Sequence, residues 1–477
     1  MFPVPFRKRI ELQQYIDSEE LLRALEEHST PTIRVNRNKW DLTPLNSSPV
    51  PWCRDGFFLD SRASYTMDPL FHAGCYYPQE ASGMFLEEIF RQLKPEQGNT
   101  KILDLCGAPG GKSTHLSSLT GANGILVANE VIRTRAVILA ENLTRWGAPN
   151  VIVTQSDPSS FGRLPGFFDL VIVDAPCSGE GMFRDEVAVN EWSVENAAMC
   201  SDRQKRILID VWPALKEDGI LIYSTCTFNP EENEENIAWL TEKKRAESIR
   251  LNISEFQGIT EINHRGIFGY GFYPGRIRGE GFFISVVRKK EKPTEKELNI
   301  KMEYNPGINR EEIKVASDFF DTDADRLIKY HDEIIAIPCN YHDYRRISGV
   351  LKIVKAGTRL CKVKTNVRAQ NIAPLRVPLH DLALSVNCKK DIYPVVDLKT
   401  DQAQVYLSRG QFKPEKVQRG WNIVRYDGVN LGFINNIGNR INNYYPMEWR
   451  IRMDLRKNRN EKIIEWRRGA RAQRLRG

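Results

Sequence analysis

The chain has no apolar run long enough to cross a bilayer, and this absence excludes a membrane-spanning protein. A spanning helix needs about 20 successive apolar residues, and no run in the 477 residues approaches that length. Residues 1–9 contain the basic triplet Arg7-Lys8-Arg9 with no apolar segment behind it, unlike a secretory signal. The sequence therefore predicts a cytoplasmic protein with no membrane partner.

The cysteines form no C-x-x-C pair, which disfavours both a zinc site and a disulfide framework. Nine cysteines are present, and any one of them is most often a small buried hydrophobic residue. Internal repeats and low-complexity tracts are absent as well. We expect free thiols, no metal and a monomer.

The basic charge is concentrated at one end of the chain. The net charge is +7, yet residues 450–477 alone hold eleven Lys or Arg against three Asp or Glu. Such a segment attracts phosphate backbones, although a solvated helix or an unstructured arm has the same composition.

Composition and hydrophobic patterning divide the chain into five predicted segments. Residues 1–95 form an N-terminal accessory or RNA-binding domain, with a helical pattern over 10–25 and an extended stretch over 32–36. Residues 96–291 alternate apolar runs with helical segments, which is typical of a parallel α/β sheet. The others are a middle domain (292–385), a region of short strands with turns at 408–410, 427–428 and 432 (386–455), and a basic tail (456–477).

Within 96–291 we predict five strands of a parallel sheet and one later strand. The five are residues 102–105, 125–129, 151–154, 170–173 and 220–224, and the later strand is 281–287. Apolar residues at helical spacing from Ile207 to Leu215 predict a helix that ends at Glu217-Asp218-Gly219.

A glycine-rich turn follows the first strand. It reads Asp104-Leu-Cys-Gly-Ala-Pro-Gly-Gly-Lys-Ser113, and such a turn lets a ligand approach the backbone at a helix N-terminus. Cys106 stands where the first glycine of a phosphate-binding loop is required, which disfavours a nucleotide hydrolase. A tight strand-to-helix turn without a ligand is the alternative.

Three acids end successive predicted strands: Glu130, Asp157 and Asp174. The carboxyl ends of parallel strands face one crevice, where open α/β sheets bind ligands. Glu130 is placed to accept both ribose hydroxyls of a nucleoside, whereas the acids would repel a triphosphate. The pattern indicates a nucleoside without phosphates, with helix capping as the alternative for any single acid.

Two cysteines follow the fourth and fifth strands, in Asp174-Ala-Pro-Cys177-Ser-Gly-Glu-Gly181 and Ser224-Thr-Cys226-Thr227. Addition of a thiolate to C6 of cytosine makes C5 nucleophilic toward an electrophilic methyl group. The thiolate needs backbone N–H groups, a helix N-terminus or a cation nearby, and Asp174 would share a proton at the ring nitrogen if burial favours its protonated form. The residues alone leave open which cysteine attacks, and buried packing groups are the alternative.

Together these motifs resemble the Nol/Nop/Sun family of RNA cytosine-C5 methyltransferases. The resemblance implies an α/β, Rossmann-like S-adenosylmethionine-dependent methyltransferase with a seven-stranded sheet, in which 281–287 is antiparallel. It makes Cys226 the nucleophile, assigns Cys177 to product release and Asp174 to proton transfer at the ring. The S-adenosyl-L-methionine site would comprise Cys106, Gly107, Ala108, Pro109, Gly110, Gly111, Lys112, Glu130, Asp157 and Asp174.

At the C-terminal end, Gly420-Trp421, Leu431-Gly432 and Asn443-Tyr444-Tyr445-Pro446 are similar to the RsmF-like bacterial subgroup. That subgroup modifies small-subunit ribosomal RNA and carries a PUA-like RNA-binding module. The resemblance therefore implies small-subunit rRNA, or the assembled small subunit, as partner. Residues 300–385 match loosely and the tail after Arg456 departs from the pattern, so tRNA as substrate and a non-catalytic ribosome assembly factor are the alternatives.

A cytosine inside a duplex must be flipped out before side chains reach it. Candidates for the compensating contacts are the tail arginines and a basic and aromatic cluster, although such a cluster is more often part of a core. Its members are Phe268, Tyr270, Phe272, Tyr273, Arg276 and Arg278.

Overall fold

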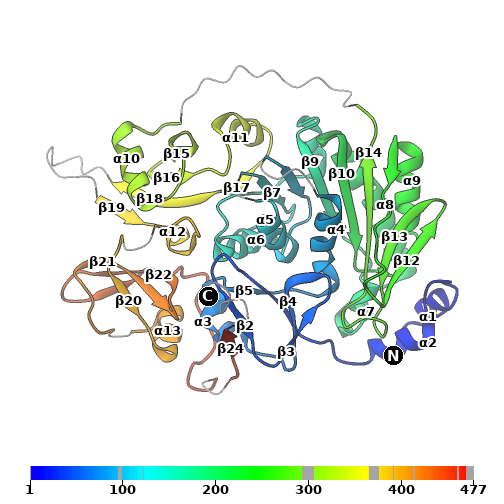
Figure 1. Ribbon diagram of the computed structural model, residues 1–477, viewed down its shortest axis with the longest axis horizontal. Helices are drawn as coiled ribbons and strands as arrows, with labels where there is room; N and C mark the ends of the chain where they lie inside the picture. The colour runs from blue at the N-terminus through cyan, green and yellow to red at the C-terminus, as the bar shows by residue number, and fades with distance from the viewer. Residues whose placement is uncertain are drawn as a thin grey trace, which may run out of the picture.

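The computed structural model describes residues 2–94, 99–121, 123–292, 306–364, 375–389, 392–411, 414–458 and 461–468. Figure 1 shows a large central sheet flanked by helices, with smaller sheets at its sides. Among the described residues, no helix combines the length and apolar character needed to span a membrane.

The N-terminal region begins with two separate helices, α1 (Val4–Glu11) and α2 (Ser18–Leu25). The helical pattern expected over residues 10–25 is confirmed only in part, because it is interrupted between Glu11 and Ser18. The side chain of Asp17 accepts a hydrogen bond from Glu20 N at 3.0 Å, which satisfies an unpaired N–H group and begins a new helix at Ser18.

A four-stranded sheet of order β3-β4-β1-β5 follows these helices. The stretch expected to be extended at 32–36 is β1 in this sheet. The elements before the central sheet are β1 (Thr32–Val35), β2 (Leu42–Pro44), β3 (Ser47–Val50), β4 (Cys53–Leu59), η1 (Tyr65–Met67), α3 (Pro69–His72), β5 (Tyr76–Pro78), η2 (Ser82–Phe85) and α4 (Leu86–Leu93).

The central sheet contains all five expected parallel strands, in the order β10-β9-β6-β7-β8. They are β6 (Lys101–Asp104), β7 (Ile125–Asn129), β8 (Val151–Thr154), β9 (Phe168–Asp174) and β10 (Leu215–Thr225). The intervening helical elements are α5 (Gly111–Leu119), α6 (Arg133–Trp146), η3 (Pro158–Arg163), η4 (Glu180–Met182), α7 (Glu186–Glu191), α8 (Val194–Val211) and η5 (Trp212–Ala214), and α9 (Glu234–Lys243) follows β10.

Both faces of this sheet are buried, which explains why its strands are continuous apolar runs. Ile102 and Leu103 are neighbours in the chain but belong to opposite cores, and Leu126 and Val127 behave in the same way. One core includes side chains of α8 and α9, and the other includes side chains of α4, α5 and α6.

The sheet extends beyond the seven strands that the resemblance implied. β14 (Phe282–Lys289) is antiparallel to β10, which confirms the expected reversal. β13 (Ile267–Phe272), β12 (Ile259–His264) and β11 (Ala246–Ser248) widen this edge. At the other edge β17 (Ile353–Ala356) pairs antiparallel with β8, so part of 292–385 completes the sheet and brings it to ten strands.

The end of the helix before β10 differs from the expectation. The helical pattern ends at η5, and Glu217-Asp218-Gly219 lies within β10. Pro213 cannot continue the helix because it lacks a backbone N–H group, and the strand pairing shifts register between Leu215 and Ile220.

Residues 306–389 add a second small sheet of order β15-β16-β18-β19. Its elements are α10 (Arg310–Phe319), η6 (Ala324–Arg326), β15 (Leu327–Tyr330), β16 (Glu333–Ala336), α11 (Tyr341–Ser348), β18 (Thr358–Lys364), β19 (Leu375–Pro378) and α12 (His380–Leu384).

The C-terminal region builds the short strands expected there. They are β20 (Val395–Asp397), β21 (Gly420–Tyr426), β22 (Val429–Asn436) and β23 (Ile441–Asn443), with α13 (Thr400–Leu407) after the first. Asp427-Gly428 forms the turn between β21 and β22, as expected. The turn expected at Gly432 is wrong: this residue lies inside β22, where an added Cβ would come within 2.3 Å of Tyr406 Oη.

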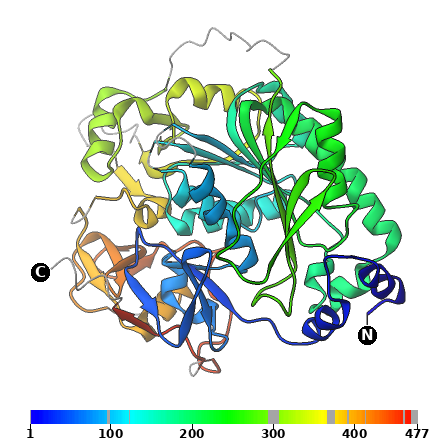
Figure 2. The same cartoon turned by 45° about the vertical axis from the view of Figure 1, so that its right-hand side comes forward.

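The last described strand lies beside the N-terminal region. β24 (Trp466–Arg468) pairs with β2, and the rings of Trp466 and Trp40 meet edge to face at 5.7 Å. Figures 1 and 2 both show the C-terminal strands beside the N-terminal sheet, and one hydrophobic core contains residues of both. The described part of the basic tail is thus partly a strand; residues 459–460 and 469–477 lie outside the described residues.

Candidate active site

A cavity of about 530 Å³ opens at the carboxyl ends of the parallel strands. It brings together the three expected acids, both expected cysteines, and Cys106 and Ala108 of the glycine-rich turn. The other expected turn residues, Gly107, Pro109, Gly110, Gly111 and Lys112, do not line it. The lining residues are Leu105, Cys106, Ala108, Asn129, Glu130, Val131, Ile132, Arg135, Asp157, Pro158, Asp174, Ala175, Pro176, Cys177, Arg203, Arg206, Ile207, Asp210 and Cys226.

The glycine-rich turn is packed too tightly for side chains at its centre. Gly107 N donates to Asn129 O at 2.8 Å, and a Cβ on Gly107 would lie 2.6 Å from Ser113 Oγ. Gly110 has φ +120° at the start of α5, a conformation that favours glycine. The turn therefore presents backbone rather than side chains to whatever occupies this end of the cavity.

The acids differ in their partners. Glu130 is buried, with 4% of its surface exposed. Its carboxylate accepts a hydrogen bond from Ile132 N at 2.9 Å and lies 3.4 Å from Arg135 Nη1. Asp157 accepts from Ser159 N and Oγ, and these hydrogen bonds lower its pKa. Asp157 thus caps η3, as the capping alternative held, and also lines the cavity.

The two thiols meet where β9 and β10 end. Asp174 and Ser224 are paired across these strands, and Cys177 Sγ lies 3.0 Å from Cys226 Sγ. Cys226 N also donates to Cys177 Sγ at 3.3 Å. The hydrogen bond to Cys226 and burial together raise the pKa of Cys177 well above its ordinary value, so Cys177 is the partner that keeps its proton.

A buried glutamate ties the two cysteine loops together. Glu232 accepts from Ser178 N at 3.0 Å and from Ser178 Oγ at 2.5 Å, and Gln204 Nε2 donates to it at 2.9 Å. Ser178 Oγ also lies 3.0 Å from Thr227 Oγ1. Glu232 was not predicted from the sequence, because its partners Ser178 and Gln204 come from distant positions in the chain.

Gly181 allows its loop to pack directly against the loop that contains Cys226. Gly181 N donates to Cys226 O at 2.8 Å, and a Cβ on Gly181 would lie 2.4 Å from Gly281 O. Gly181 is therefore needed for packing around Cys226, whereas a Cβ on Gly179 would meet no atom within 4 Å.

Lys112 does not line the cavity. It forms an ion pair with Asp174, which does. Its Nζ lies 2.8 Å from Asp174 Oδ2, and Ser224 Oγ donates to Asp174 Oδ1 at 2.8 Å. The Asp174 side chain is 31% exposed, so the burial on which its expected proton transfer depends is incomplete.

Lys112 also supplies the cation that a thiolate requires. Burial by itself would lower the pKa of Lys112, but the interactions with Asp174 and Cys226 outweigh it and raise the pKa. Sequence analysis had assigned Lys112 to the cofactor only.

The remaining basic residues at the cavity, Arg135, Arg203 and Arg206, were not anticipated. By contrast, most of the aromatic cluster proposed for RNA is core: Tyr270, Phe272 and Tyr273 are buried. The alternative interpretation therefore holds for these three aromatic residues, whereas Arg276 and Arg278 are exposed and remain predictions.

The fold and the cavity define a Rossmann-like methyltransferase, and comparisons with known proteins narrow the class. Residues 2–81 match the N-terminal domain of 16S rRNA methyltransferase RsmF, 90–288 match 16S rRNA methyltransferase RsmB/F, and 393–451 match the methyltransferase RsmF PUA domain.

Relatives extend this similarity along the chain. Ribosomal RNA small subunit methyltransferase F of Aliivibrio fischeri (strain ATCC 700601 / ES114) is 30% identical over 470 residues, covering 92% of this chain and 94% of that one. The protein of the same name from Vibrio vulnificus (strain YJ016) is 31% identical over 419 residues, 84% and 85% of the two chains. A solved methyltransferase homolog from Pyrococcus horikoshii is 30% identical, with a TM-score of 0.51, over 60% of this chain and 95% of its own.

The chain belongs to the RsmF family of small-subunit rRNA methyltransferases. It is an RNA methyltransferase, and its resemblance to RNA cytosine-C5 methyltransferases of the RsmF-like subgroup is confirmed.

Proposed function

We propose that the protein transfers a methyl group from S-adenosyl-L-methionine to C5 of a cytosine in small-subunit rRNA. The observation that carries this proposal is the 3.0 Å contact between Cys177 and Cys226 in a cavity also lined by Glu130 and Asp157. The names of the relatives support rRNA as substrate. We expect a cytoplasmic monomer that acts on the rRNA or on the assembled small subunit.

The residues present fit S-adenosyl-L-methionine, which supplies an electrophilic methyl group when bound. Glu130 would accept the ribose hydroxyls, and the apolar Val131 and Ile132 beside it would flank the base. Asp157 and the turn Cys106–Lys112 would complete the site, with the backbone of the turn lying close to the ligand.

Cys226 begins the reaction as nucleophile. The Cys177 S–H group donates to the Cys226 sulfur, and the Lys112 cation stabilises charge on it, so Cys226 is the thiol prepared to attack. A bond forms between Cys226 Sγ and C6, and the C5–C6 π electrons become available at C5. Asp174, which also lines the cavity, takes a proton from Lys112 Nζ, 2.8 Å from its Oδ2, and shares it with the ring nitrogen as charge develops there.

Release requires loss of the C5 proton and rupture of the Cys226–C6 bond. Once Cys226 is bonded to carbon it carries no charge, so one cause of the raised pKa of Cys177 disappears. Cys177 then loses its own proton to solvent and, as the thiolate, accepts the C5 proton; the C5–C6 double bond re-forms, and Cys226 leaves as a thiolate. Cys177 is thereby assigned to product release.

Methyl transfer to purified RNA tests the proposal. With labelled S-adenosyl-L-methionine, the protein should produce 5-methylcytosine in small-subunit rRNA, as naked RNA or in the assembled subunit. Cys226→Ala should lower the rate at least about 10³-fold, whereas Cys388→Ala, a half-buried cysteine outside the cavity, should leave it unchanged.

Other outcomes separate the alternatives. Methylation of tRNA in place of rRNA would overturn the substrate, and salt-dependent RNA binding without any transfer would indicate an assembly factor. Normal turnover by Cys226→Ala would overturn the assignment of the nucleophile.

A further inference from the structure

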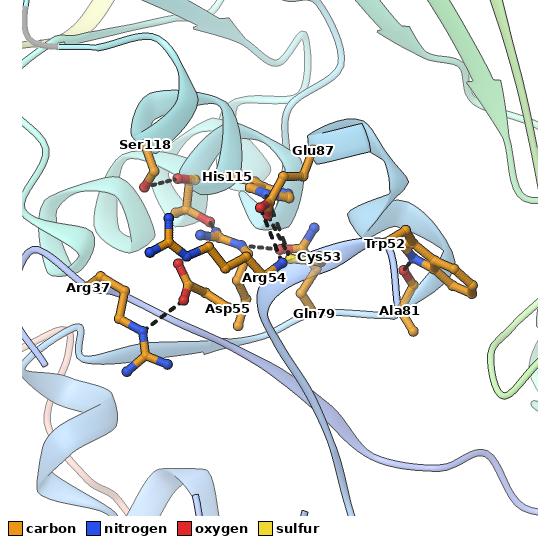
Figure 3. Close-up of polar contacts among 12 residues, drawn as sticks. Arg37, Trp52, Cys53, Arg54, Asp55, Gln79, Ala81, Glu87, His115 and Ser118 are labelled. Carbon is orange, nitrogen blue, oxygen red and sulfur yellow. Dashed lines mark hydrogen bonds and ion pairs between the residues drawn. The ribbon is translucent and has the colours of Figure 1, made fainter. Parts of the chain in front are cut away.

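Three potential metal ligands meet between the N-terminal sheet and the helix that follows the glycine-rich turn, outside the cavity described above. Cys53 begins β4, Glu87 lies in α4 and His115 lies in α5 (Figure 3). Cys53 Sγ is 3.0 Å from Glu87 Oε2, His115 Nε2 is 3.2 Å from the same oxygen, and Cys53 Sγ is 4.0 Å from His115 Nε2. Three separate elements thus direct a sulfur, an oxygen and a nitrogen at one point.

This cluster is mostly shielded from water. Cys53 and His115 are each 2% exposed by residue area, and the Glu87 side chain is 26% exposed. Glu87 Oε1 accepts from Arg54 N at 3.2 Å, which fixes the orientation of the carboxylate. His115 Nδ1 is buried without a hydrogen-bond partner among the described residues.

We propose that Cys53, Glu87 and His115 bind a zinc ion. Ligand atoms separated by these distances surround a point about 2 Å from each of them, close to the bond lengths of zinc to nitrogen and oxygen and slightly short of that to sulfur. A mixed sulfur, nitrogen and oxygen set suits zinc and disfavours magnesium and calcium, which take oxygen ligands. A water molecule would supply the fourth ligand.

Binding would exchange one proton for the ion. The thiol of Cys53 loses its proton to solvent and the sulfur bonds to zinc, so thiolate and carboxylate together balance two positive charges. His115 is buried, and the neutral ring is the form that coordinates a metal.

Arg34 opposes binding because it adds a positive charge near the site. Its guanidinium is held by Gln79 Oε1 at 2.8 Å and Thr114 Oγ1 at 2.7 Å, and it lies over the Trp146 ring at 4.3 Å. These contacts hold the Arg34 guanidinium against the side chains just named rather than against Cys53 or His115.

The ion would help to hold the glycine-rich turn in place. His115 lies one turn into α5, the helix that begins at Gly111, while Glu87 and Cys53 belong to α4 and to the N-terminal sheet. None of the three lines the active-site cavity. The site is thus a structural link between the N-terminal region and the turn, and it does not depend on the proposed reaction.

Zinc binding by the full chain tests this proposal. After removal of metals with a chelator, the chain should bind about one equivalent of zinc, release a proton and unfold at a higher temperature. Cys53→Ser keeps a hydrogen-bond donor toward Glu87 but removes the soft ligand, so it should weaken binding at least about tenfold. Cys361→Ser alters another buried cysteine and should bind zinc as the unaltered chain does.

Two further measurements keep the test decisive. Cobalt added to the unaltered chain should give a thiolate-to-metal absorption band, whatever the folding of the variants. Cys226→Ser removes a thiol of the active-site pair and should retain the zinc. No zinc and no cobalt band in the unaltered chain, or zinc retained by Cys53→Ser and lost by Cys226→Ser, would overturn the proposal.

Discussion

Lys112 illustrates how much the role of a residue depends on partners that its motif does not reveal. Its position in the glycine-rich turn predicts a cofactor contact, yet its ammonium pairs with Asp174, a residue from a different strand. The contact arises because β6 and β9 are adjacent in the sheet. The motif therefore predicts Lys112 as a site residue but does not predict its ion pair with Asp174.

Asp104 is a buried acid at the same turn, and its protonation affects stability. Burial raises its pKa to about 7, against 3.8 for the ordinary carboxyl group. Between these values the folded chain keeps a proton that the unfolded chain has lost. Its contribution to stability is therefore complete below about pH 4 and is lost as the pH rises through 7.

Asp104→Asn should remove this dependence, because the amide resembles the protonated acid. Relative to the variant, the unaltered chain should lose about 2 kcal/mol of unfolding free energy between pH 5 and pH 7.5. Urea titrations at several pH values would measure the difference. A difference that is constant with pH would show that Asp104 is ionised in the folded chain throughout.

The central sheet shows which elements a sequence predicts well. Its strands are apolar on both faces and are interrupted by glycine-rich or acidic turns, so all five parallel strands were found. Because those strands are adjacent, the meeting of Cys177, Cys226 and Asp174 was also predictable. The break between α1 and α2 was missed because a single capping side chain, Asp17, outweighs a continuous apolar pattern.

The edges of the sheet were harder to predict. β17 comes from about 200 residues after β8, with which it pairs, and no local pattern specifies such a partner. Arg203 and Arg206 were missed for the same reason, because their importance comes from the cavity that forms around them, and Glu232 was missed because its partners Ser178 and Gln204 come from distant positions in the chain.

A buried ion pair secures β17 and the neighbouring β18 and α12. Lys355 Nζ lies 2.6 Å and Arg359 Nη2 lies 3.0 Å from the Asp381 carboxylate. Burial acts to raise the pKa of Asp381, but the two cations outweigh it and hold the pKa well below its ordinary value. The Lys355 side chain is 8% exposed, so its charge depends on Asp381.

Asp381→Asn should cost about 3 to 5 kcal/mol of unfolding free energy, because it leaves the buried charge of Lys355 uncompensated. Chemical denaturation would measure this cost. Asp397→Asn breaks the exposed pair with Arg425, where the Asp397 side chain is 67% exposed, and should cost less than about 1 kcal/mol. Equal costs for the two variants would contradict the ranking.

The ends of the chain are joined in one structural unit. Besides the strand pairing of β24 with β2, Leu45 N donates to Glu465 O at 2.7 Å and Ser64 N donates to Lys462 O at 2.8 Å. Ile464 belongs to the core that the N-terminal and C-terminal regions share. The C-terminal segment thus holds the PUA region against the N-terminal sheet.

Truncation before residue 461 should lower the unfolding free energy of this unit by about 3 kcal/mol, since Ile464 and Trp466 lose their burial. Limited proteolysis should then cut the N-terminal sheet faster. A truncation after Arg468 keeps the strand and removes only residues 469–477, so it should leave both readouts unchanged. Equal effects of the two truncations would show that β24 does not stabilise the unit.

The most direct test of the chemistry is the covalent link between the protein and its RNA. Incubated with S-adenosyl-L-methionine and small-subunit rRNA, Cys177→Ser should accumulate an RNA adduct that survives denaturing electrophoresis, and peptide mapping should place the bond on Cys226. Cys226→Ser should form none. An adduct mapped to another residue, or none with Cys177→Ser although the unaltered chain methylates the RNA, would contradict the division of roles between the two thiols.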